Sequence, residues 1–162
     1  MRVILGIDPG FTAAGFGILK KEQRGVFLLE SSYLKMSSTK KLPERIAIFH
    51  DFFSEKIIVR SVTDIALETP FLGKNAQNFL KLGYLRGIIY LLAHRHQLVL
   101  HEFSPREVKQ AVTGFGGAGK DQVARVVLQL FPRLEHPEKA DVTDALAITL
   151  CGLWKQKNKF YG

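Results

Sequence analysis

Val3-Ile4-Leu5-Gly6-Ile7-Asp8-Pro9-Gly10 is an apolar run that ends at an acidic residue and a turn signal. An apolar run of this length, bounded by proline and glycine, predicts a buried strand followed by a turn. Asp8 is therefore expected at the end of a buried strand. Taken alone it is explained as a turn residue, so its significance depends on what the rest of the chain brings beside it.

On the C-terminal side of this strand, the chain alternates between strand and helix patterns. Apolar runs predict strands over Phe16–Leu19 and Val26–Leu29, with Lys20–Gly25 as the hairpin between them. The further expected elements are a helix over Pro43–Val59, a strand over Ile65–Leu67, a helix over Asn75–Arg95, a strand over Gln97–Phe103, a short helix opened by Ser104-Pro105, and helices over Asp121–Leu130 and Lys139–Trp154. This order predicts an α/β fold with one mixed five-stranded sheet and helices on both faces, and it resembles the ribonuclease-H-like fold.

Length and composition suit a globular protein. The 162 residues fit one domain, and we expect residues 1–162 to form it. No apolar run approaches the ~20 residues that span a bilayer, and the apolar start is too short for a signal peptide. Cys151 is the single cysteine and cannot form an intrachain disulfide. These features predict a cytoplasmic protein without membrane contact.

The net charge of +8 is concentrated in the middle of the chain. Residues 69–132 carry eight basic and three acidic side chains, against ten and eight in residues 1–68. A solvated basic surface without a partner would explain this pattern, but so would a polyanion, of which nucleic acid is the commonest. The basic tail of Lys155, Lys157 and Lys159 is typical of a solubilising end.

Four acidic side chains have one explanation in common. Asp8 and Glu68 each end a predicted strand, and Asp141 and Asp144 lie three apart on the inward face of a predicted helix. Carboxylates that converge at one sheet edge repel one another unless a cation compensates them. Oxygen ligands without a Cys/His cluster suit Mg²⁺ or Mn²⁺, and two such ions could stabilise the attacking water and the leaving oxygen of a phosphodiester.

A collinear set of motifs resembles the RuvC family of Holliday-junction resolvases over nearly the whole chain. The motifs are Gly6-Ile7-Asp8-Pro9-Gly10, Glu68, Phe71 with Lys74-Asn75, Lys81-Leu82-Gly83…Arg86-Gly87, Ser104-Pro105…Val108-Lys109, Gly119-Lys120 and Asp141…Asp144-Ala145-Leu146-Ala147. The resemblance implies a homodimeric, magnesium-dependent crossover junction endodeoxyribonuclease. Such an enzyme binds four-way DNA junctions and nicks two opposing strands symmetrically. It also implies cooperation with a branch-migration helicase complex.

The same resemblance assigns the site residues. The implied metal ligands, for two Mg²⁺ ions per subunit with Mn²⁺ as a substitute, are Asp8, Glu68, Asp141 and Asp144, and the implied catalytic lysine is Lys120. The implied DNA contacts are Phe71, Lys74, Asn75, Lys81, Arg86, Lys109 and Lys120. Phe71 would stack on a base near the crossover, although the chain has 12 phenylalanines and an ordinary core residue is the alternative. Lys109 and Lys120 could instead be plain surface lysines.

The chain departs from the family pattern in the segment after Glu68. Thr69-Pro70 stands where relatives carry longer or more polar spacers, and Gly73 precedes Lys74 where alanine is expected. The shape of the Phe71 loop is therefore open.

The segment Gly114-Phe-Gly-Gly-Ala-Gly119-Lys120 has the spacing of a nucleotide-binding P-loop, but Asp121 replaces the hydroxyl residue that binds Mg²⁺. We therefore expect no nucleotide there; instead, the backbone N–H groups of this loop are expected to cradle a DNA phosphate. His136, five residues before Asp141, could approach the site.

Three other functions remain compatible with the sequence. One is a ribonuclease-H-like nuclease of other substrate, such as an RNA–DNA hybrid. Another is a non-catalytic module that binds branched DNA. The third is an actin-like ATPase, which needs two such domains where this chain supplies one.

Overall fold

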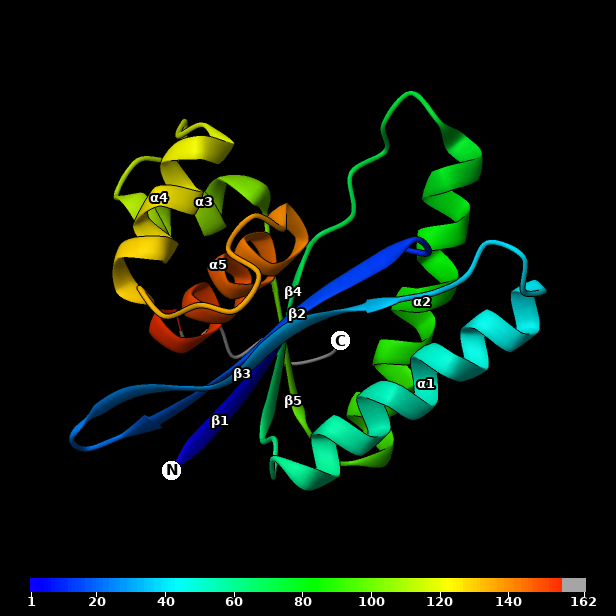
Figure 1. Cartoon of the computed structure of the whole chain (residues 1–162), viewed down its shortest axis with the longest axis horizontal. Helices are drawn as coiled ribbons and strands as arrows, with labels where there is room; N and C mark the ends of the chain where they lie inside the picture. The colour runs from blue at the N-terminus through cyan, green and yellow to red at the C-terminus, as the bar shows by residue number, and fades with distance from the viewer. Residues whose placement is uncertain (156–162) are drawn as a thin grey trace.

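The sheet determines where the functional side chains lie. A computed structural model of the chain describes residues 1–155, so Lys157 and Lys159 of the basic tail lie outside the described residues. The elements are β1 (Arg2–Asp8), β2 (Ala13–Glu22), β3 (Gly25–Lys35), α1 (Leu42–Val59), β4 (Asp64–Glu68), α2 (Ala76–Arg95), β5 (Val99–Phe103), α3 (Pro105–Thr113), α4 (Lys120–Leu130) and α5 (Ala140–Trp154) (Figure 1). None of the described helices is both long and apolar enough to cross a membrane.

The five strands form one mixed sheet in the order β3-β2-β1-β4-β5. The first three strands make an antiparallel meander, whereas β1, β4 and β5 run parallel. Ile7 of β1 pairs with Leu67 of β4, so the next residues, Asp8 and Glu68, leave the sheet at the same edge. The predicted α/β architecture and element order are confirmed.

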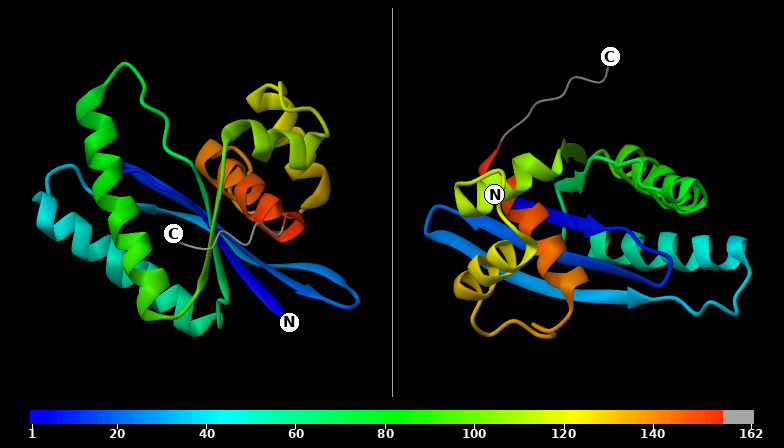
Figure 2. Two further views of the ribbon diagram at one scale, coloured as in Figure 1. Left: turned by 180° about the vertical axis from the view of Figure 1, so that it is seen from behind. Right: turned by 90° about the horizontal axis from the view of Figure 1, so that it is seen from above.

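Helices cover both faces of the sheet, as predicted. In β1, Val3, Leu5 and Ile7 pack in a core cluster with side chains from α1 and α2. Ile4, on the opposite face, packs with the apolar side chains of α3, α4 and α5. Figure 2 shows these two layers from behind and from above the sheet. Because side chains alternate along a strand, Asp8 lies on the same face as Ile4, beneath α5.

The meander strands are longer than the sequence indicates. The expected hairpin Lys20–Gly25 shortens to the two residues between β2 and β3, and β3 continues to Lys35 instead of ending at Leu29. Residues with polar side chains belong to these strands because the β2–β3 ladder continues through them, with a register shift between Ile18 and Leu19. Apolar runs therefore located the strands but underestimated their length.

A buried polar network joins the amino-terminal halves of three strands, far from the edge that carries Asp8. The Asp64 carboxylate accepts hydrogen bonds from the Arg2 guanidinium at 2.7 Å and from Thr63 Oγ1 at 2.6 Å, and it lies 2.8 Å from His101 Nε2. Burial alone would raise the pKa of Asp64, but the hydrogen bonds from His101, Arg2 and Thr63 outweigh it and hold that pKa well below its usual range. The charged form of Asp64 therefore stabilises the fold.

Replacing Asp64 by asparagine is expected to lower the free energy of unfolding by about 2 kcal/mol at pH 7, because a buried ionic network loses its charge. A carboxyl whose pKa falls on folding contributes stability above about pH 4, and this contribution is lost as the pH falls toward the folded pKa. The difference between Asp64→Asn and the unaltered protein should therefore shrink below pH 4. Urea unfolding at pH 7 and pH 3.5 measures it, and a pH-independent difference would contradict the assignment.

Candidate catalytic site

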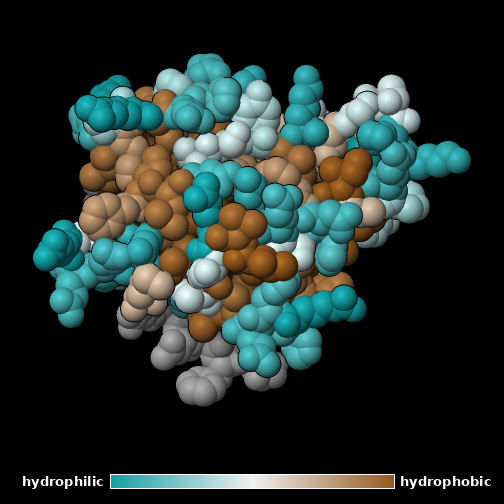
Figure 3. Space-filling view, turned by 60° about the horizontal axis from the view of Figure 1, so that its bottom comes forward, coloured by the Kyte–Doolittle hydropathy of each residue, from teal (hydrophilic) through white to brown (hydrophobic). Residues whose placement is uncertain are grey.

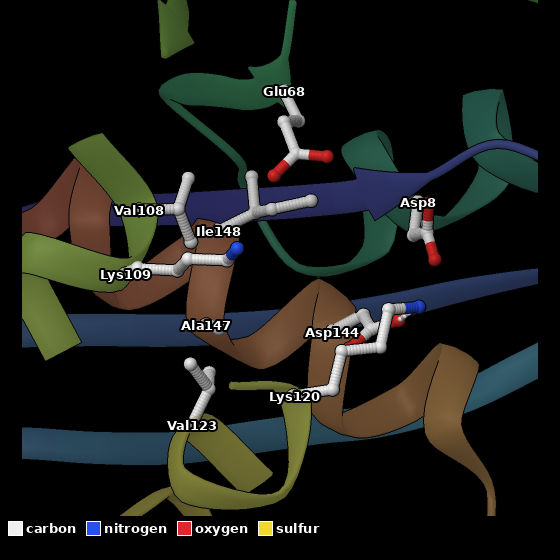
Figure 4. Close-up of a pocket in the computed structure, with 9 residues that line it drawn as sticks. All are labelled: Asp8, Glu68, Val108, Lys109, Lys120, Val123, Asp144, Ala147 and Ile148. Atoms are coloured by element: carbon white, nitrogen blue, oxygen red, sulfur yellow. Dashed lines mark ion pairs between the residues drawn. The ribbon is translucent and has the colours of Figure 1, made fainter. Parts of the chain in front are cut away.

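A pocket of about 170 Å³ opens at the edge of the sheet where β1 and β4 end. Three carboxylates and two lysines reach into it, from five different elements (Figure 4). Its full lining is Asp8, Glu68, Val108, Lys109, Lys120, Val123, Asp144, Ala147 and Ile148. The pocket thus gathers residues separated by more than a hundred positions in the chain.

The strand geometry explains why two of the carboxylates face the pocket. Ala66 of β4 packs in the core cluster beneath α5, so Glu68, two residues on, points to the same face. Asp8 is placed on that face by the same alternation in β1. Figure 4 shows both carboxylates directed into the space between the sheet edge and the helices.

The other two acids come from the first turns of α5, which lies unusually close to the sheet. Gly15 of β2 is the register partner of Asp8, and a Cβ placed on Gly15 would lie 1.9 Å from the carbonyl oxygen of Asp141. Only a glycine allows this approach, which sets Asp141 beside Asp8 and Asp144 one turn further on. Asp144 lines the pocket, whereas Asp141 does not.

The carboxylates influence one another electrostatically. Burial, and then the charges of Asp144, Asp141 and Glu68, raise the pKa of Asp8 to about 7, while Lys120 opposes this shift. Burial and Asp144 also raise the pKa of Glu68, against the lowering effect of Lys109 and Lys120. The site is therefore short of positive charge, which is the condition that a bound cation relieves.

Two lysines supply part of that positive charge. Lys120 Nζ lies 3.6 Å from Asp144 Oδ2, and the Lys120 side chain is 82% exposed. Burial raises the pKa of Asp144, while the charge of Lys120 and its hydrogen bond lower it. Lys109, on α3, also lines the pocket. A long exposed side chain that is weakly paired can move toward a bound phosphate.

The donor set suits a hard divalent cation. The acidic ligands predicted from the sequence offer only oxygen atoms. Mg²⁺ and Mn²⁺ prefer oxygen ligands, whereas Zn²⁺ is commonly bound by nitrogen and sulfur ligands. Within residues 1–155, no group of three or more histidine, cysteine, aspartate or glutamate side chains already stands at metal-binding spacing. The shared coordination of a cation by all four acids therefore stays a prediction, while the common pocket of Asp8, Glu68 and Asp144 is an observation.

Phe71 projects from the β4–α2 connection and is 81% exposed, so the alternative of an ordinary core phenylalanine is wrong. It lines a second hollow, beside the first, that also includes Asp8 and Glu68. Its ring is thus available next to the acids, as a base-stacking role requires.

The remaining predicted DNA contacts lie around this loop. Lys74 and Lys81 are exposed. The side chain of Asn75 caps α2 by accepting a hydrogen bond from Asn78 N at 3.1 Å, a local role that the sequence analysis did not assign.

Arg86 has a different position from the one expected. It is buried, with 7% of its surface exposed, and its guanidinium donates to the Glu68 carbonyl oxygen at 2.7 Å and to the Glu102 carboxylate. Tyr90 completes the cluster by donating to Glu102 at 2.6 Å. We therefore correct the expected DNA contact of Arg86 to a positioning role at the end of β4. Sequence reasoning missed Glu102 and Tyr90 because neither stands in a recognisable motif.

His136 rests against the ring of Tyr33, with the ring centroids 5.4 Å apart, and its Nδ1 lies 3.8 Å from Glu138. It does not line the pocket of the acids, so the approach that its place in the sequence left open is not seen in this structure.

Comparisons with known proteins agree on one family. Residues 4–152 match the family described as crossover junction endodeoxyribonuclease RuvC. The chain is 41% identical to a protein of that name from Chlorobium phaeobacteroides over 157 residues, covering 97% of this chain and 84% of that protein. It is 37% identical to the Legionella pneumophila protein of the same name over 151 residues, covering 93% of this chain and 86% of that protein.

Solved structures agree with the sequence comparisons. The Thermus thermophilus RuvC in complex with Holliday junction substrate superposes with a TM-score of 0.86 at 29% identity, covering 95% of this chain and 94% of that one. Both the sequence match and the fold extend across the strand ends and the helix that carry the acidic pocket. The chain therefore belongs to the crossover junction endodeoxyribonuclease RuvC family.

Proposed function

We propose that this protein is a metal-dependent endonuclease that resolves Holliday junctions by paired, symmetric nicks in opposing strands, in recombination and repair. One observation carries the proposal: Asp8, Glu68 and Asp144 share a pocket with Lys109 and Lys120. Carboxylates with raised pKa values beside lysines suit a site that holds divalent cations against a phosphodiester. The family membership supplies the reaction and the class of substrate.

The ligands proposed for two Mg²⁺ ions per subunit, with Mn²⁺ as a substitute, are Asp8, Glu68, Asp141 and Asp144. When bound, such ions activate water as a nucleophile and neutralise the charge that develops on the phosphate. The carboxylates would hold the ions in fixed positions, because each carboxylate comes from the end of a strand or from a helix terminus that packs on the sheet. Lys120 and Lys109 then hold the phosphate backbone by charge, independently of sequence.

The function is tested by cleavage of a synthetic four-way junction with Mg²⁺, compared with a linear duplex and an RNA–DNA hybrid. Symmetric nicking of the junction alone supports the proposal. Preferential hydrolysis of the hybrid favours a ribonuclease-H-like nuclease of other substrate. Junction binding without Mg²⁺-dependent cutting favours a non-catalytic branched-DNA module.

A homodimer is proposed for the working enzyme, because two nicks of like polarity require two sites related by a two-fold axis. The exposed face of α2 supports it: Leu80, Tyr84 and Leu91 are 57%, 39% and 39% exposed along one side of the helix. Gly83 and Gly87 share that side, and a Cβ on either would meet nothing within 4 Å. Small residues between apolar ones let two helices approach closely. We further propose that the enzyme acts together with a branch-migration helicase complex and that it is located in the cytoplasm.

A divalent cation is expected to stabilise the protein, because it relieves the repulsion among the acids. Since the pKa of Asp8 is raised to about 7 on folding, its contribution to metal-free stability is present below about pH 4 and is lost as the pH rises through 7. Thermal melting at pH 8 should rise by several degrees with Mg²⁺ or Ca²⁺.

The Asp8→Asn variant should melt above the unaltered protein at pH 8 without metal, and should gain less from added Ca²⁺. Asp51→Asn is the matched control, since the Asp51 side chain is 80% exposed on α1. An equal metal-dependent rise in both variants would argue against the assignment of Asp8 as a ligand.

Replacing Phe71 by alanine is expected to leave junction affinity within about threefold while reducing the cleavage rate by roughly tenfold. The ring is exposed beside the acids, so its loss should affect how a strand is seated more than how the phosphates are held. Single-turnover cleavage and Ca²⁺-supported binding measure the two effects separately. An unchanged cleavage rate would count against base engagement by Phe71.

A further inference from the structure

Most N–H groups of the glycine loop between α3 and α4 are already engaged, which disfavours the phosphate cradle expected from the sequence. Its N–H groups donate within the loop and its flanking helices. Those hydrogen bonds run from Gly114 to Gln110 O at 2.9 Å, from Phe115 to Thr113 Oγ1 at 3.1 Å, from Gly116 to Gln110 Oε1 at 2.9 Å, from Ala118 to Phe115 O at 3.1 Å and from Gly119 to Gln122 Oε1 at 2.8 Å. A loop that satisfies its own donors has few left for an anion.

The same hydrogen bonds make the loop a rigid support for one side chain. Two side chains of α3 hold the loop by further hydrogen bonds. The Gln110 amide also donates to Gly114 O at 2.8 Å, and Thr113 Oγ1 donates to Phe115 O at 3.0 Å. A Cβ placed on Gly117 would lie 2.6 Å from the Phe115 ring, so the glycine leaves room for the ring beside the loop. Phe115 is nevertheless 62% exposed.

Basic residues flank Phe115 in the chain. Lys109 precedes the loop and Lys120 follows it, and both line the pocket of the acids. Arg106 lies beneath the loop, because a Cβ on Gly116 would come within 2.7 Å of its side chain. An aromatic ring among cationic side chains is the combination that binds single-stranded or unstacked nucleic acid.

Phe71 and Phe115 lie on segments that flank the sheet edge from different sides. Figure 1 shows the β4–α2 connection, which carries Phe71, on one side of the sheet edge, and α3 with α4 on the other. Hydrophobic and hydrophilic side chains are interspersed on the face drawn in Figure 3, so exposed apolar groups occur elsewhere on the molecule. What distinguishes Phe115 is its rigid support and the two pocket lysines that bracket it in the chain.

We propose that Phe115 is a second base-stacking side chain, which contacts an unstacked base of the junction strand crossing the α3–α4 side of the pocket. This inference rests on the proposed function, because it takes junction DNA as the ligand. The ring would hold the strand in place by its face, while Lys109 and Lys120 hold the backbone on either side. A DNA strand whose bases stack on both Phe71 and Phe115 would be held at a fixed position over the carboxylates of the pocket.

The test measures binding, so that it does not depend on cleavage. A fluorescently labelled four-way junction is titrated with protein in Ca²⁺, and linear duplex of the same length serves as the comparison. Phe115→Ala and Phe115→Leu should weaken junction binding by about tenfold. Phe115→Tyr and Phe115→Trp should bind within about twofold of the unaltered chain, because they keep an aromatic face. Duplex binding should change less, since its bases stay stacked.

Phe27→Ala is the matched control, because Phe27 is also an exposed phenylalanine, at 46%, but lies on the β3 edge strand. It should bind the junction as the unaltered chain does. Equal affinities for Phe115→Ala and the unaltered chain would overturn the inference, and so would full retention of affinity by Phe115→Leu. Failure of the unaltered chain to bind any junction would overturn the proposed function as well.

A spectroscopic readout separates stacking from a structural effect. Trp154 is the single tryptophan, so a Trp154→Phe, Phe115→Trp variant places the only indole in the loop. Its emission should be quenched when junction DNA is added in Ca²⁺, because a base stacks on it. Unquenched emission in a complex of normal affinity would contradict the proposed contact.

Discussion

Replacing Asp8 by asparagine is expected to abolish junction cleavage, with a loss of about a thousandfold or more, while junction binding is retained. The amide keeps the size of the side chain but removes one negative charge from the ligand set. Several kcal/mol of transition-state stabilisation depend on cations held by such carboxylates. The proposed phosphate contacts come from Lys109 and Lys120, which line the same pocket and which the substitution leaves in place.

Removing a carboxylate from a pocket that receives phosphate reduces repulsion, so metal-free junction binding by Asp8→Asn should be equal to or tighter than that of the unaltered chain. Binding by anisotropy and single-turnover cleavage in Mg²⁺ measure the two effects, with Asp51→Asn as the control of equal charge change. Cleavage by Asp8→Asn at the unaltered rate would remove Asp8 from the catalytic site.

The position of Asp8 was predictable because it depends on local rules. A strand that ends at proline and glycine places its last side chain at the sheet edge, and the pattern at Glu68 is the same. The inward face of α5 was equally visible, since Asp144 continues into a stripe of buried residues through Ile148 to Cys151. Backbone periodicity and turn chemistry therefore located the acids before any tertiary structure was known.

The role of Arg86 and the hydrogen bonding of the glycine loop could not be predicted, for a common reason. Their sequence motifs identify residue types, whereas their roles depend on which neighbours the fold supplies. The guanidinium of Arg86 finds Glu102 on β5, sixteen residues away, and becomes a buried support. The N–H groups of Gly116 and Gly119 donate to Gln110 and Gln122 on the flanking helices, so these two are not free to bind phosphate. Neither pairing has a signature in the local sequence.

The expected convergence of α5 with the strand ends depends on a close contact that the sequence pattern does not show. It depends on Gly15, which looks like an ordinary strand glycine until its register partner is known to be Asp8. The space that its missing side chain leaves is filled by the backbone of Asp141. The absence of a side chain at Gly15 thus determines how closely the backbone of Asp141 approaches Asp8.

Gly15→Ala is therefore expected to damage catalysis although it lies outside the ligand set. The added Cβ would meet the carbonyl oxygen of Asp141 at 1.9 Å and its carbonyl carbon at 2.3 Å. Backbone atoms cannot swing away as a side chain would, so the start of α5 must shift. A displacement of about 1 Å costs on the order of a hundredfold in rate, and the overpacking costs about 2–3 kcal/mol of stability.

Three measurements distinguish this mechanism from plain unfolding. Circular dichroism at 20 °C should remain that of a folded protein, urea unfolding should report the lost stability, and Ca²⁺ titration should show a weakened metal site. Gly73→Ala is the matched control, since a Cβ there meets nothing within 4 Å, and it should cleave normally. A folded Gly15→Ala protein with unchanged cleavage would mean that the acids of α5 tolerate displacement. In that case Asp8 and Glu68, fixed on adjacent strands, would carry the metal chemistry by themselves.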